Sequence, residues 1–401
     1  MAAILYAWEF GANLGHVGAF MPLARSLRDQ GHAVHWAVTQ PAAVGDFLAA
    51  QNFACVAAPV VPELPRPGPP LSYADILLRF GYADAKALFG LVGAWMELMR
   101  LTGAQLVMAD HAPTAVLAAR ILRLPVMLFS NGFTVPPRRS PMPNMRPWAE
   151  VPQQVLVDLD AAALRSINLV LGRFGHAPLE HLANLFDVAE ESLVSFPELD
   201  HYADRGPARY WGSLPSAGGG AKLQWPDGPD GAGGSTRIFA YLRREAVHAA
   251  SALIALHALG HPTLIYFPEV AAEFVARFSA PHLRFAAQAA DIEQMTAEAD
   301  LAVTYSSLAT TTAFLLAGKP LLLLPTHLEQ FLVARRVVDM GAGAVVSPEA
   351  PVGDLAPMLA ELLNNPVYRQ NAQGFADKYA KFDQQAVIAN LVRRVAEVLA
   401  R

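Results

Sequence analysis

The sequence predicts an α/β protein made of two doubly wound parallel sheets. Short apolar runs alternate with amphipathic, helix-like segments along the chain, and a stretch rich in Gly and Pro divides this alternation into two series. Strands that alternate with helices in this way favour parallel pairing. A length of 401 residues is enough for two domains of ordinary size.

Composition narrows the class of protein. The chain is 53% hydrophobic and 16% charged, but its apolar runs are too short to span a bilayer. Runs of this length, bounded by Gly, Pro or charge, are typical of buried parallel strands. The first segment, Met1–Trp8, has no basic residues before its apolar ones, so we expect a first strand rather than a signal peptide, and a cytoplasmic protein.

Cysteine content and charge exclude further classes. The single cysteine, Cys55, excludes an intrachain disulfide and a cysteine-based metal cluster, and no other metal site is apparent. A net charge of −5 argues against a nucleic-acid partner, because nucleic-acid phosphates require a basic face.

The first series of elements begins with an apolar strand. We expect strands at 3–8, 33–38, 105–109 and 126–129, and helices from about 17 to 30 and from 113 to 122. Gly31 is a natural C-cap for the first of these helices. Two Pro-rich segments, 58–70 and 135–152, interrupt the series and are expected to be irregular.

A linker separates the two series. Gly and Pro dominate residues 215–235, which therefore cannot hold regular structure. We expect an N-terminal domain at 1–214 and a C-terminal domain at 236–401, with the last helix packing back on the first domain. Within the second domain we expect a helix at 246–259, strands at 237–242, 263–267, 301–304, 321–324 and 344–346, and a helical end with apolar repeats at Val387, Leu391, Val395 and Leu399.

The strand at 301–304 leads into a turn and then a helix. Such a unit directs backbone N–H groups and the positive end of the helix dipole at whatever lies above the turn, so it is an anion cradle. Its polar members are Tyr305, Ser306, Ser307, Thr310 and Thr311.

His16 and Asp110 follow two predicted strands of the first domain, at the edge where open α/β sheets bind ligands. A histidine suits a general base, and a buried aspartate on its far nitrogen fixes the tautomer and stabilises the imidazolium. Singly, the two residues also fit plainer roles, a polar residue near a helix start and a helix N-cap.

The segment from Ala299 to Gln330 resembles the donor-binding signature of the GT-B nucleotide-sugar glycosyltransferases, the large family that holds plant UDP-glycosyltransferases and bacterial macrolide glycosyltransferases. Glu329-Gln330 is kept, but the turn reads Tyr305-Ser306-Ser307 where the family has His-Gly-Gly or His-Cys-Gly. Further matches follow the family's order along the chain: Gly15-His16, Val107 to Asp110, Ser195 to Asp200, and Arg209 to Gly212.

This resemblance implies a GT-B architecture, two Rossmann-like domains facing across a cleft. It implies inverting transfer of a sugar from a UDP- or dTDP-linked donor to a hydroxyl or amine of a small, largely apolar acceptor, with no cofactor and no metal. His16 would be the base and Asp110 its orienting partner. The sugar would meet His327, Glu329 and Gln330, although these residues also fit an exposed helix start with an acid in its first turn.

Two further expectations concern the donor. Arg243 and Arg244 follow the strand at 237–242, and either one would replace the missing signature histidine as a diphosphate ligand. A solvated turn with two surface arginines that bind no ligand fits the same segment equally well. The nucleotide base is expected at the loop from Arg284 to Ala290, with Phe285 and Gln288, although this loop lacks the family's Trp platform and Phe285, its only aromatic residue, also fits a core position.

Two other functions fit the same sequence. One is a GT-B binding or partner protein that has lost turnover. The other is a transferase with a lipid or peptide acceptor, in peripheral contact with a membrane through segments such as 64–77 or 142–148. Oligomeric state is not predicted.

Overall fold

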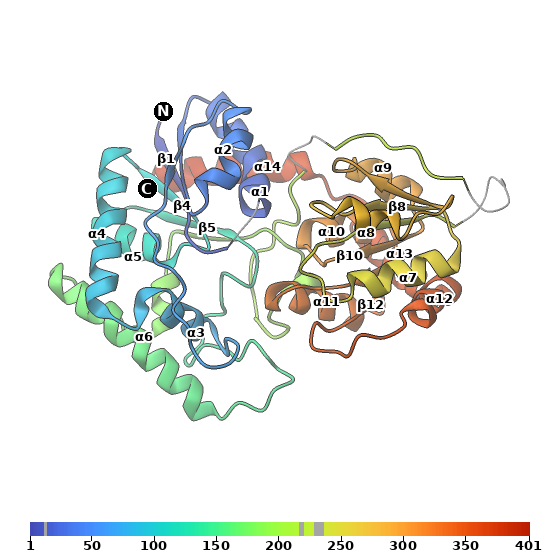
Figure 1. Ribbon diagram of the computed structural model, residues 1–401. Helices are drawn as coiled ribbons and strands as arrows, with labels where there is room; N and C mark the ends of the chain where they lie inside the picture. Colours follow the sequence, from blue (N-terminus) through green and yellow to red (C-terminus); the bar gives the residue numbers. More distant parts are fainter. Residues whose placement is uncertain (12–13, 216–219, 228–235) are drawn as a thin grey trace. The chain divides into compact units, whose positions relative to one another are not determined.

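The computed structural model describes residues 1–11, 14–215, 220–227 and 236–401 (Figure 1). Contacts within the chain divide it into two compact units. Unit 1 comprises Met1–Phe196, Asp204–Ala217 and Gln384–Arg401, and unit 2 comprises Pro197–Ala203 and Gly218–Asp383. The expected linker at 215–235 falls largely on 216–219 and 228–235, which lie outside the described residues.

Unit 1 is built on a six-stranded sheet whose described strands all pair in parallel, in the order β3-β2-β1-β4-β5-β6. The strands are β1 (Ala3–Trp8), β2 (Ala33–Val38), β3 (Cys55–Ala57), β4 (Leu106–Asp110), β5 (Val126–Ser130) and β6 (Glu190–Leu193). Central strands β1 and β4 are almost wholly apolar and buried, as parallel strands covered on both faces must be.

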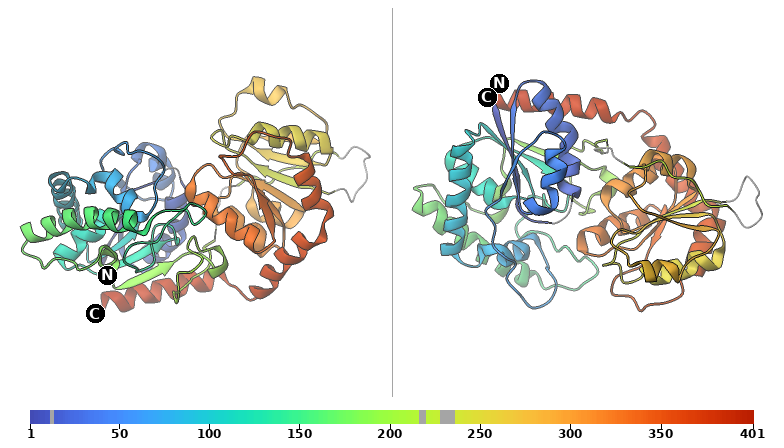
Figure 2. Two further views of the ribbon diagram at one scale, coloured as in Figure 1. Left: turned by 90° about the horizontal axis from the view of Figure 1, so that it is seen from below. Right: turned by 45° about the horizontal axis from the view of Figure 1, so that its top comes forward.

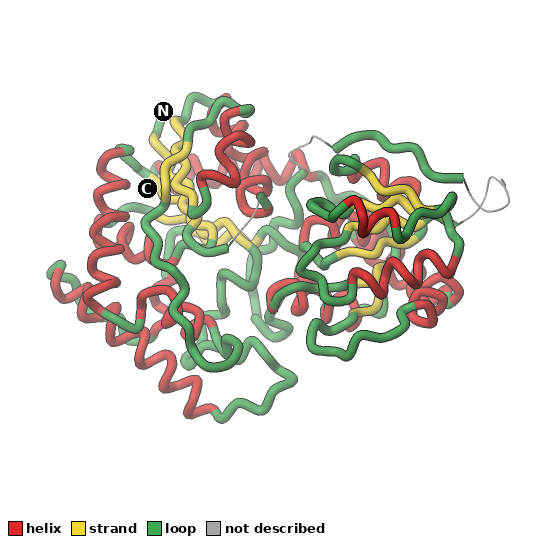
Figure 3. Tube along the Cα trace, in the orientation of Figure 1, coloured by secondary structure: helices red, strands yellow, loops and turns green. Residues whose placement is uncertain are grey.

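The helices of unit 1 are α1 (Gly15–Asp29), α2 (Pro41–Ala49), α3 (Tyr73–Leu77), α4 (Ala85–Leu101), α5 (Pro113–Leu122), α6 (Gln153–Arg173) and α14 (Gln384–Leu399), with shorter helical turns η1 (Leu78–Tyr82) and η2 (Leu182–Phe186). A third short turn, η3 (Pro197–Leu199), belongs to unit 2. Helix α4 packs against α5 and α6, and α14 packs against α1. The strands lie between helices, yellow between red in Figure 3.

Unit 2 repeats the plan with a second parallel sheet, in the order β12-β11-β10-β7-β8-β9. Its strands are β7 (Ile238–Tyr241), β8 (Thr263–Tyr266), β9 (Leu283–Ala286), β10 (Leu301–Thr304), β11 (Leu321–Leu323) and β12 (Gly343–Val345). Its helices are α7 (Ala249–Leu259), α8 (Ala272–Ala276), α9 (Ile292–Glu298), α10 (Leu308–Leu316), α11 (Leu328–Asp339), α12 (Ala356–Asn364) and α13 (Pro366–Lys378).

The predicted fold class, two doubly wound parallel sheets, is confirmed. The expected strands lie within a residue or two of the observed ones, because a short buried apolar run marks a parallel strand directly. Helix boundaries differ more. Helix α1 begins at Gly15 rather than near Val17, so His16 belongs to its first turn, and α7 begins at Ala249 rather than 246.

Strand register sets the position of two groups of candidate site residues, one in each unit. In unit 1, Trp8 pairs with Asp110 at the carboxyl ends of β1 and β4. In unit 2, Tyr241 pairs with Thr304 at the carboxyl ends of β7 and β10. In each sheet these two strands are the point where the strand order reverses, which is where open α/β sheets bind ligands.

The C-terminal helix α14 completes unit 1 although it lies furthest along the chain. Its buried residues, among them Leu391 and Val395, face α1, and both views in Figure 2 place the two chain ends side by side. Arg394 donates through Nε to Oε2 of the buried Glu190 at 2.6 Å, and Arg209 donates to the other oxygen at 3.0 Å. This ion pair ties α14 to strand β6.

Removing Arg394 should therefore weaken unit 1. Replacement by Ala leaves Glu190 buried with only Arg209 as a charged partner, so we expect a loss of about 1.5–3 kcal/mol in the free energy of unfolding, measured by urea denaturation. The exposed neighbour Arg393 is the matched control, and Arg393→Ala should change stability by less than about 0.5 kcal/mol. Equal losses in the two variants would contradict a specific role for the ion pair.

Candidate functional site

His16 and Asp110 form a hydrogen-bonded pair in unit 1. Helix α1 presents His16 and strand β4 ends on Asp110, and the distance between His16 Nδ1 and Asp110 Oδ2 is 3.0 Å. The Asp110 side chain is 4% exposed and that of His16 is 17% exposed. With Nδ1–H donating to the carboxylate, Nε2 carries the lone pair, which is the arrangement that a general base needs.

Asp110 is held by two more donors besides His16. Tyr6 Oη donates to Oδ2 at 2.8 Å and Ser130 Oγ donates to Oδ1 at 2.8 Å. Burial by itself raises the pKa of Asp110, but the neighbouring His16 charge and the three hydrogen bonds outweigh it and lower the pKa below the usual value. The carboxylate is thus ionised and fixed in orientation. Burial, followed by the nearby Asp110 charge, raises the pKa of Tyr6 well above its usual value, so this tyrosine stays neutral.

The surroundings of the His16 ring were not predicted from the sequence. The ring stacks on Trp8 with 5.2 Å between centroids, and the ring of His111 lies 6.5 Å away at an interplanar angle of 28°. Gly11 has a φ of +113°, and a Cβ there would come within 2.8 Å of His16 Nε2. His111 follows Asp110 directly and has a φ of 47°, a conformation that is costly for a non-glycine residue. Such strain recurs at functional sites, so His111 is a candidate lining residue.

Glu9 is a second residue that sequence reasoning missed. It follows strand β1 and is 2% exposed, with Oε2 accepting from the Thr114 backbone N–H at 2.8 Å, near the start of α5. Within the described part of the chain its Oε1 has no hydrogen-bond partner. Burial raises the pKa of Glu9 to about 8, although hydrogen bonds from Thr114 and Ala115 partly oppose the shift. An acid directly after a buried strand was the signal in the sequence.

The predicted anion cradle in unit 2 has the expected strand, turn and helix. Ser307 is the N-cap of α10, and its side chain accepts from the Thr310 N–H at 3.4 Å. Ser306 has a φ of 65°, and its Oγ donates to the Gln330 carbonyl at 2.9 Å. Serine thus takes the left-handed conformation that favours glycine, and this hydrogen bond helps to hold it. Thr311 is fully buried in the first turn of α10, and its Oγ1 has no partner among the described residues.

Tyr305 contacts side chains at the end of the neighbouring strand β7 and just after it. Its ring meets that of Tyr241 edge-on with 4.8 Å between centroids, and the Arg243 guanidinium lies 5.6 Å above its centroid. Burial, and then the charge and hydrogen bonding of Tyr305, raise the pKa of Tyr241. Arg243 also lies 3.7 Å from the exposed carboxylate of Glu245, whereas Arg244 is itself exposed. The structure therefore brings Arg243, not Arg244, to the turn.

The residues expected to bind the sugar begin helix α11, after the strand next to β10. His327 is its N-cap residue and Glu329 lies in its first turn. Gln330 Oε1 accepts from the backbone N–H of Thr326 at 2.8 Å and from Thr326 Oγ1 at 2.9 Å. This leaves the amide NH2 of Gln330 as the group best suited to meet a ligand. Ser306 and Gln330 are in direct contact, so the two predicted groups of donor residues adjoin.

The expected nucleotide-base loop is not a simple loop. Phe285 belongs to strand β9 and packs against the core of unit 2, because the segment pairs with β8 as the edge of the sheet. Gln288 lies in the connection beyond it. Strands β7 and β8 separate β9 from β10. The expectation of an open loop at 284–290 is therefore wrong for its first half.

Metal-binding clusters and membrane spans were sought in the same residues. Over 1–11, 14–215, 220–227 and 236–401, no three His, Cys, Asp or Glu side chains come together in a way that could hold a metal ion. None of the helices in these ranges combines the length and apolar character that crossing a membrane requires.

Comparison with solved structures identifies the class of fold. The chain is similar to the spinosyn rhamnosyltransferase SpnG (TM-score 0.69, 18% identity, covering 98% of this chain and 100% of that one). It is also similar to the glycosyltransferase VinC in complex with dTDP (0.65, 17%, 98% and 100%) and to the glycosyltransferase SnogD from Streptomyces nogalater (0.63, 17%, 98% and 99%). No family model matches the sequence, and no curated protein matches it.

These likenesses extend over 98% of this chain and at least 99% of each of the others, so the two sheets match the two-domain GT-B fold. The fold that the sequence motifs implied is thereby confirmed. At 17–18% identity the comparison shows the fold, and the chemistry has to be argued from the side chains.

Glu9 should make stability depend on pH. Its pKa is about 8 in the folded chain, against an ordinary value of 4.5. Between these values the unfolded chain ionises Glu9 and the folded chain does not, so its contribution to stability falls as pH rises to about 8 and then levels off. Glu9→Gln cannot ionise. We expect urea denaturation at pH 5, 7 and 9 to show the variant gaining stability relative to the wild type as pH rises, by a few kcal/mol.

Glu97 on α4 is the control for this effect, because Glu97→Gln removes a carboxyl that is exposed to solvent. The difference in the free energy of unfolding between the Glu97→Gln variant and the wild type should be the same at every pH. A constant difference between Glu9→Gln and the wild type across the three pH values would show that Glu9 is ionised in the fold.

Proposed function

We propose that this protein is an inverting glycosyltransferase that moves a sugar from a nucleoside-diphosphate donor to a hydroxyl or amine of a largely apolar small molecule. The observation that carries the proposal is the His16–Asp110 pair at the carboxyl edge of a GT-B sheet. Nδ1 of His16 lies 3.0 Å from Oδ2 of Asp110, and Tyr6 and Ser130 hold the carboxylate in place.

The chemistry follows from the atoms present. Nε2 of His16 takes the proton from the acceptor hydroxyl, and the oxygen of that hydroxyl forms a bond to the anomeric carbon of the sugar. The bond from that carbon to the diphosphate breaks in the same step, and the electron pair leaves with the nucleoside diphosphate. Asp110 stabilises the imidazolium that forms and keeps Nδ1 protonated. Direct displacement inverts the anomeric configuration.

Unit 2 supplies the groups for the departing diphosphate. The α10 N-terminus offers backbone N–H groups and a positive dipole, and Ser307 and Thr310 add hydroxyls, while Thr311 is buried in the same turn. Arg243 supplies the cation at Tyr305, where the sequence departs from the family turn. Glu329 and Gln330 then hydrogen-bond the sugar hydroxyls. Hydrogen-bond donors that are already positioned where negative charge develops on the leaving group usually make the largest single contribution to the rate enhancement.

The ligands of the similar structures suggest the substrate class. VinC is described with dTDP, and SpnG with thymidine diphosphate and with spinosyn aglycone. For the present chain we extend this to a UDP- or dTDP-linked sugar and a natural-product-like aglycone. A protein that only bound its ligands would have no need of a carboxylate that two further donors, Tyr6 and Ser130, hold against a histidine, so turnover is favoured over a binding or partner role.

Removing the base should abolish transfer without loss of donor binding. His16→Ala should lower kcat by about 10²–10⁴ while the affinity for UDP or dTDP, measured by calorimetry, stays near wild type. Asp110→Asn should lose less, because it acts only through His16. Wild-type turnover in His16→Ala would remove the pair from the mechanism.

Arg243 and Arg244 form a matched pair of variants for the donor site. A charge-assisted hydrogen bond to phosphate contributes about 1.5–3 kcal/mol, so Arg243→Ala should weaken nucleoside-diphosphate binding about 10- to 100-fold. Arg244→Ala should leave binding unchanged, because its side chain is exposed and does not reach Tyr305 in the way Arg243 does. Tyr305→His, which restores the family residue, should keep or strengthen binding. Unchanged affinity in Arg243→Ala would mean that the helix dipole and hydroxyls suffice.

A further inference from the structure

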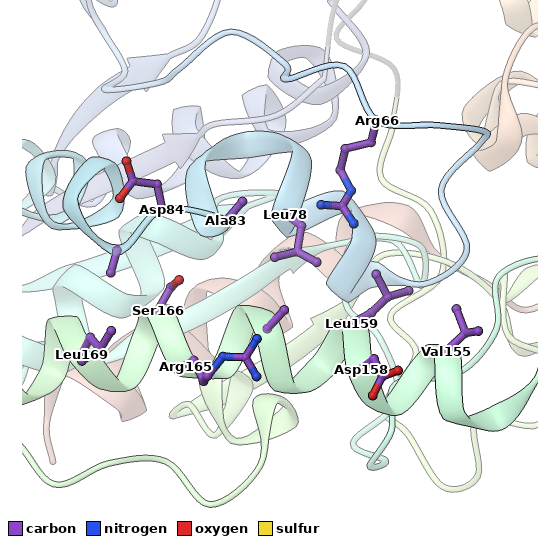
Figure 4. Close-up of a pocket in the computed structure, with 12 residues that line it drawn as sticks. Arg66, Leu78, Ala83, Asp84, Val155, Asp158, Leu159, Arg165, Ser166 and Leu169 are labelled. Carbon is purple, nitrogen blue, oxygen red and sulfur yellow. The ribbon is translucent and has the colours of Figure 1, made fainter.

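Unit 1 has a groove that is lined by none of the candidate site residues described above. The groove has a volume of about 680 Å³ and runs along helix α6 (Figure 4). On its other side lie Leu78 and the turn from Ala83 to Ala85 that begins α4, with Arg66 above it. The lining mixes apolar side chains with charges of both signs, whereas ligand pockets are lined predominantly by apolar and aromatic side chains.

One face of α6 forms the long side of this groove. Val155, Asp158, Ala162, Arg165 and Leu169 recur at alternating spacings of three and four residues, so they share one stripe of the helix. Leu169 is 62% exposed and Val155 is 37% exposed. The opposite face is buried through Leu156, Ala163, Ile167 and Val170. An exposed stripe with helix-pairing spacing on a well-anchored 21-residue helix is suited to another helix.

We propose that this stripe binds a second copy of the chain, with the two α6 helices packed antiparallel about a two-fold axis near Ala162. In that arrangement Val155 meets Leu169 of the second copy, and Leu169 meets the second copy's Val155. Ala162 faces its own counterpart at the axis, where a small side chain lets the helices approach closely. The same surface therefore serves both copies, as a two-fold interface requires.

Charge selects this orientation. Asp158 lies one turn on one side of Ala162, and Arg165 lies about one turn on the other. Antiparallel packing brings Asp158 of each copy to Arg165 of the other, whereas parallel packing would set like charges together. Asp158 is already oriented along the helix by Gln154, whose Nε2 donates to Oδ1 at 2.9 Å.

The groove enlarges the contact beyond a single helix. Two-fold interfaces that persist in solution bury about 800 Å² per partner, more than one helical stripe provides. Leu78, Ala83 and Asp84 line the wall opposite the stripe and receive the flank of the second copy's helix. Arg66 on that wall is held in place by Asp75, 3.1 Å from its Nε.

Single charge reversals test the pairing. Analytical ultracentrifugation of the full-length wild type should give a dimer of the 43.1 kDa chain. Asp158→Arg places only positive charges at the pairing positions and Arg165→Asp only negative ones, so each variant alone should be monomeric. An equimolar mixture of the two variants should dimerise, because every pairing across the axis then joins opposite charges. Circular dichroism confirms that both variants are folded.

A reversal elsewhere provides the control. Arg100 lies on the exposed side of α4, and Arg100→Asp should leave the wild-type dimer intact. A monomeric wild type at the highest soluble concentration would overturn the proposal. So would a dimer that survives both single reversals, or two monomeric variants that fail to associate when mixed.

Discussion

The ionised, buried Asp110 is the constraint on which the candidate active site depends. Taking a carboxylate out of water is costly, and this one is compensated by His16, Tyr6 and Ser130 together. Each donor comes from a different element, α1, β1 and β5, so the parallel register of the sheet has to be correct before the carboxylate can be buried. The sheet register of unit 1 and the orientation of the candidate base therefore depend on the same hydrogen bonds.

The turn after β10 shows how the fold accommodates a departure from the GT-B donor motif. Replacing a glycine-rich turn with Tyr305-Ser306-Ser307 introduces a left-handed serine and a bulky ring. The Ser306 hydroxyl bonds to the carbonyl of Gln330, and the ring packs between Tyr241 and Arg243. Strand β7 thus supplies the support for the ring through Tyr241, and the segment just after β7 places the Arg243 guanidinium beside it.

Much of this was predictable from the sequence, and the rest was not for identifiable reasons. Buried parallel strands are short apolar runs, so the two sheets could be predicted, and His16 and Asp110 stood beside them. The partners Tyr6 and Thr114 lie 104 and 105 positions from the acids they contact, and no local pattern marks such pairs. The choice between Arg243 and Arg244 needed the β7–β10 register. Residues 284–286 were taken for part of a loop because a short edge strand of mixed polarity resembles one, and the core position left open for Phe285 is the one observed.

The stereochemistry of the product tests the central claim most directly. An α-linked dTDP- or UDP-sugar is incubated with the protein and hydroxyl-bearing apolar aglycones, and the anomeric coupling of the isolated glycoside is read by NMR. A proton-abstracting His16 and direct displacement predict the β-glycoside. An α-glycoside would contradict the account, as would hydrolysis of the donor with no glycoside formed from any aglycone.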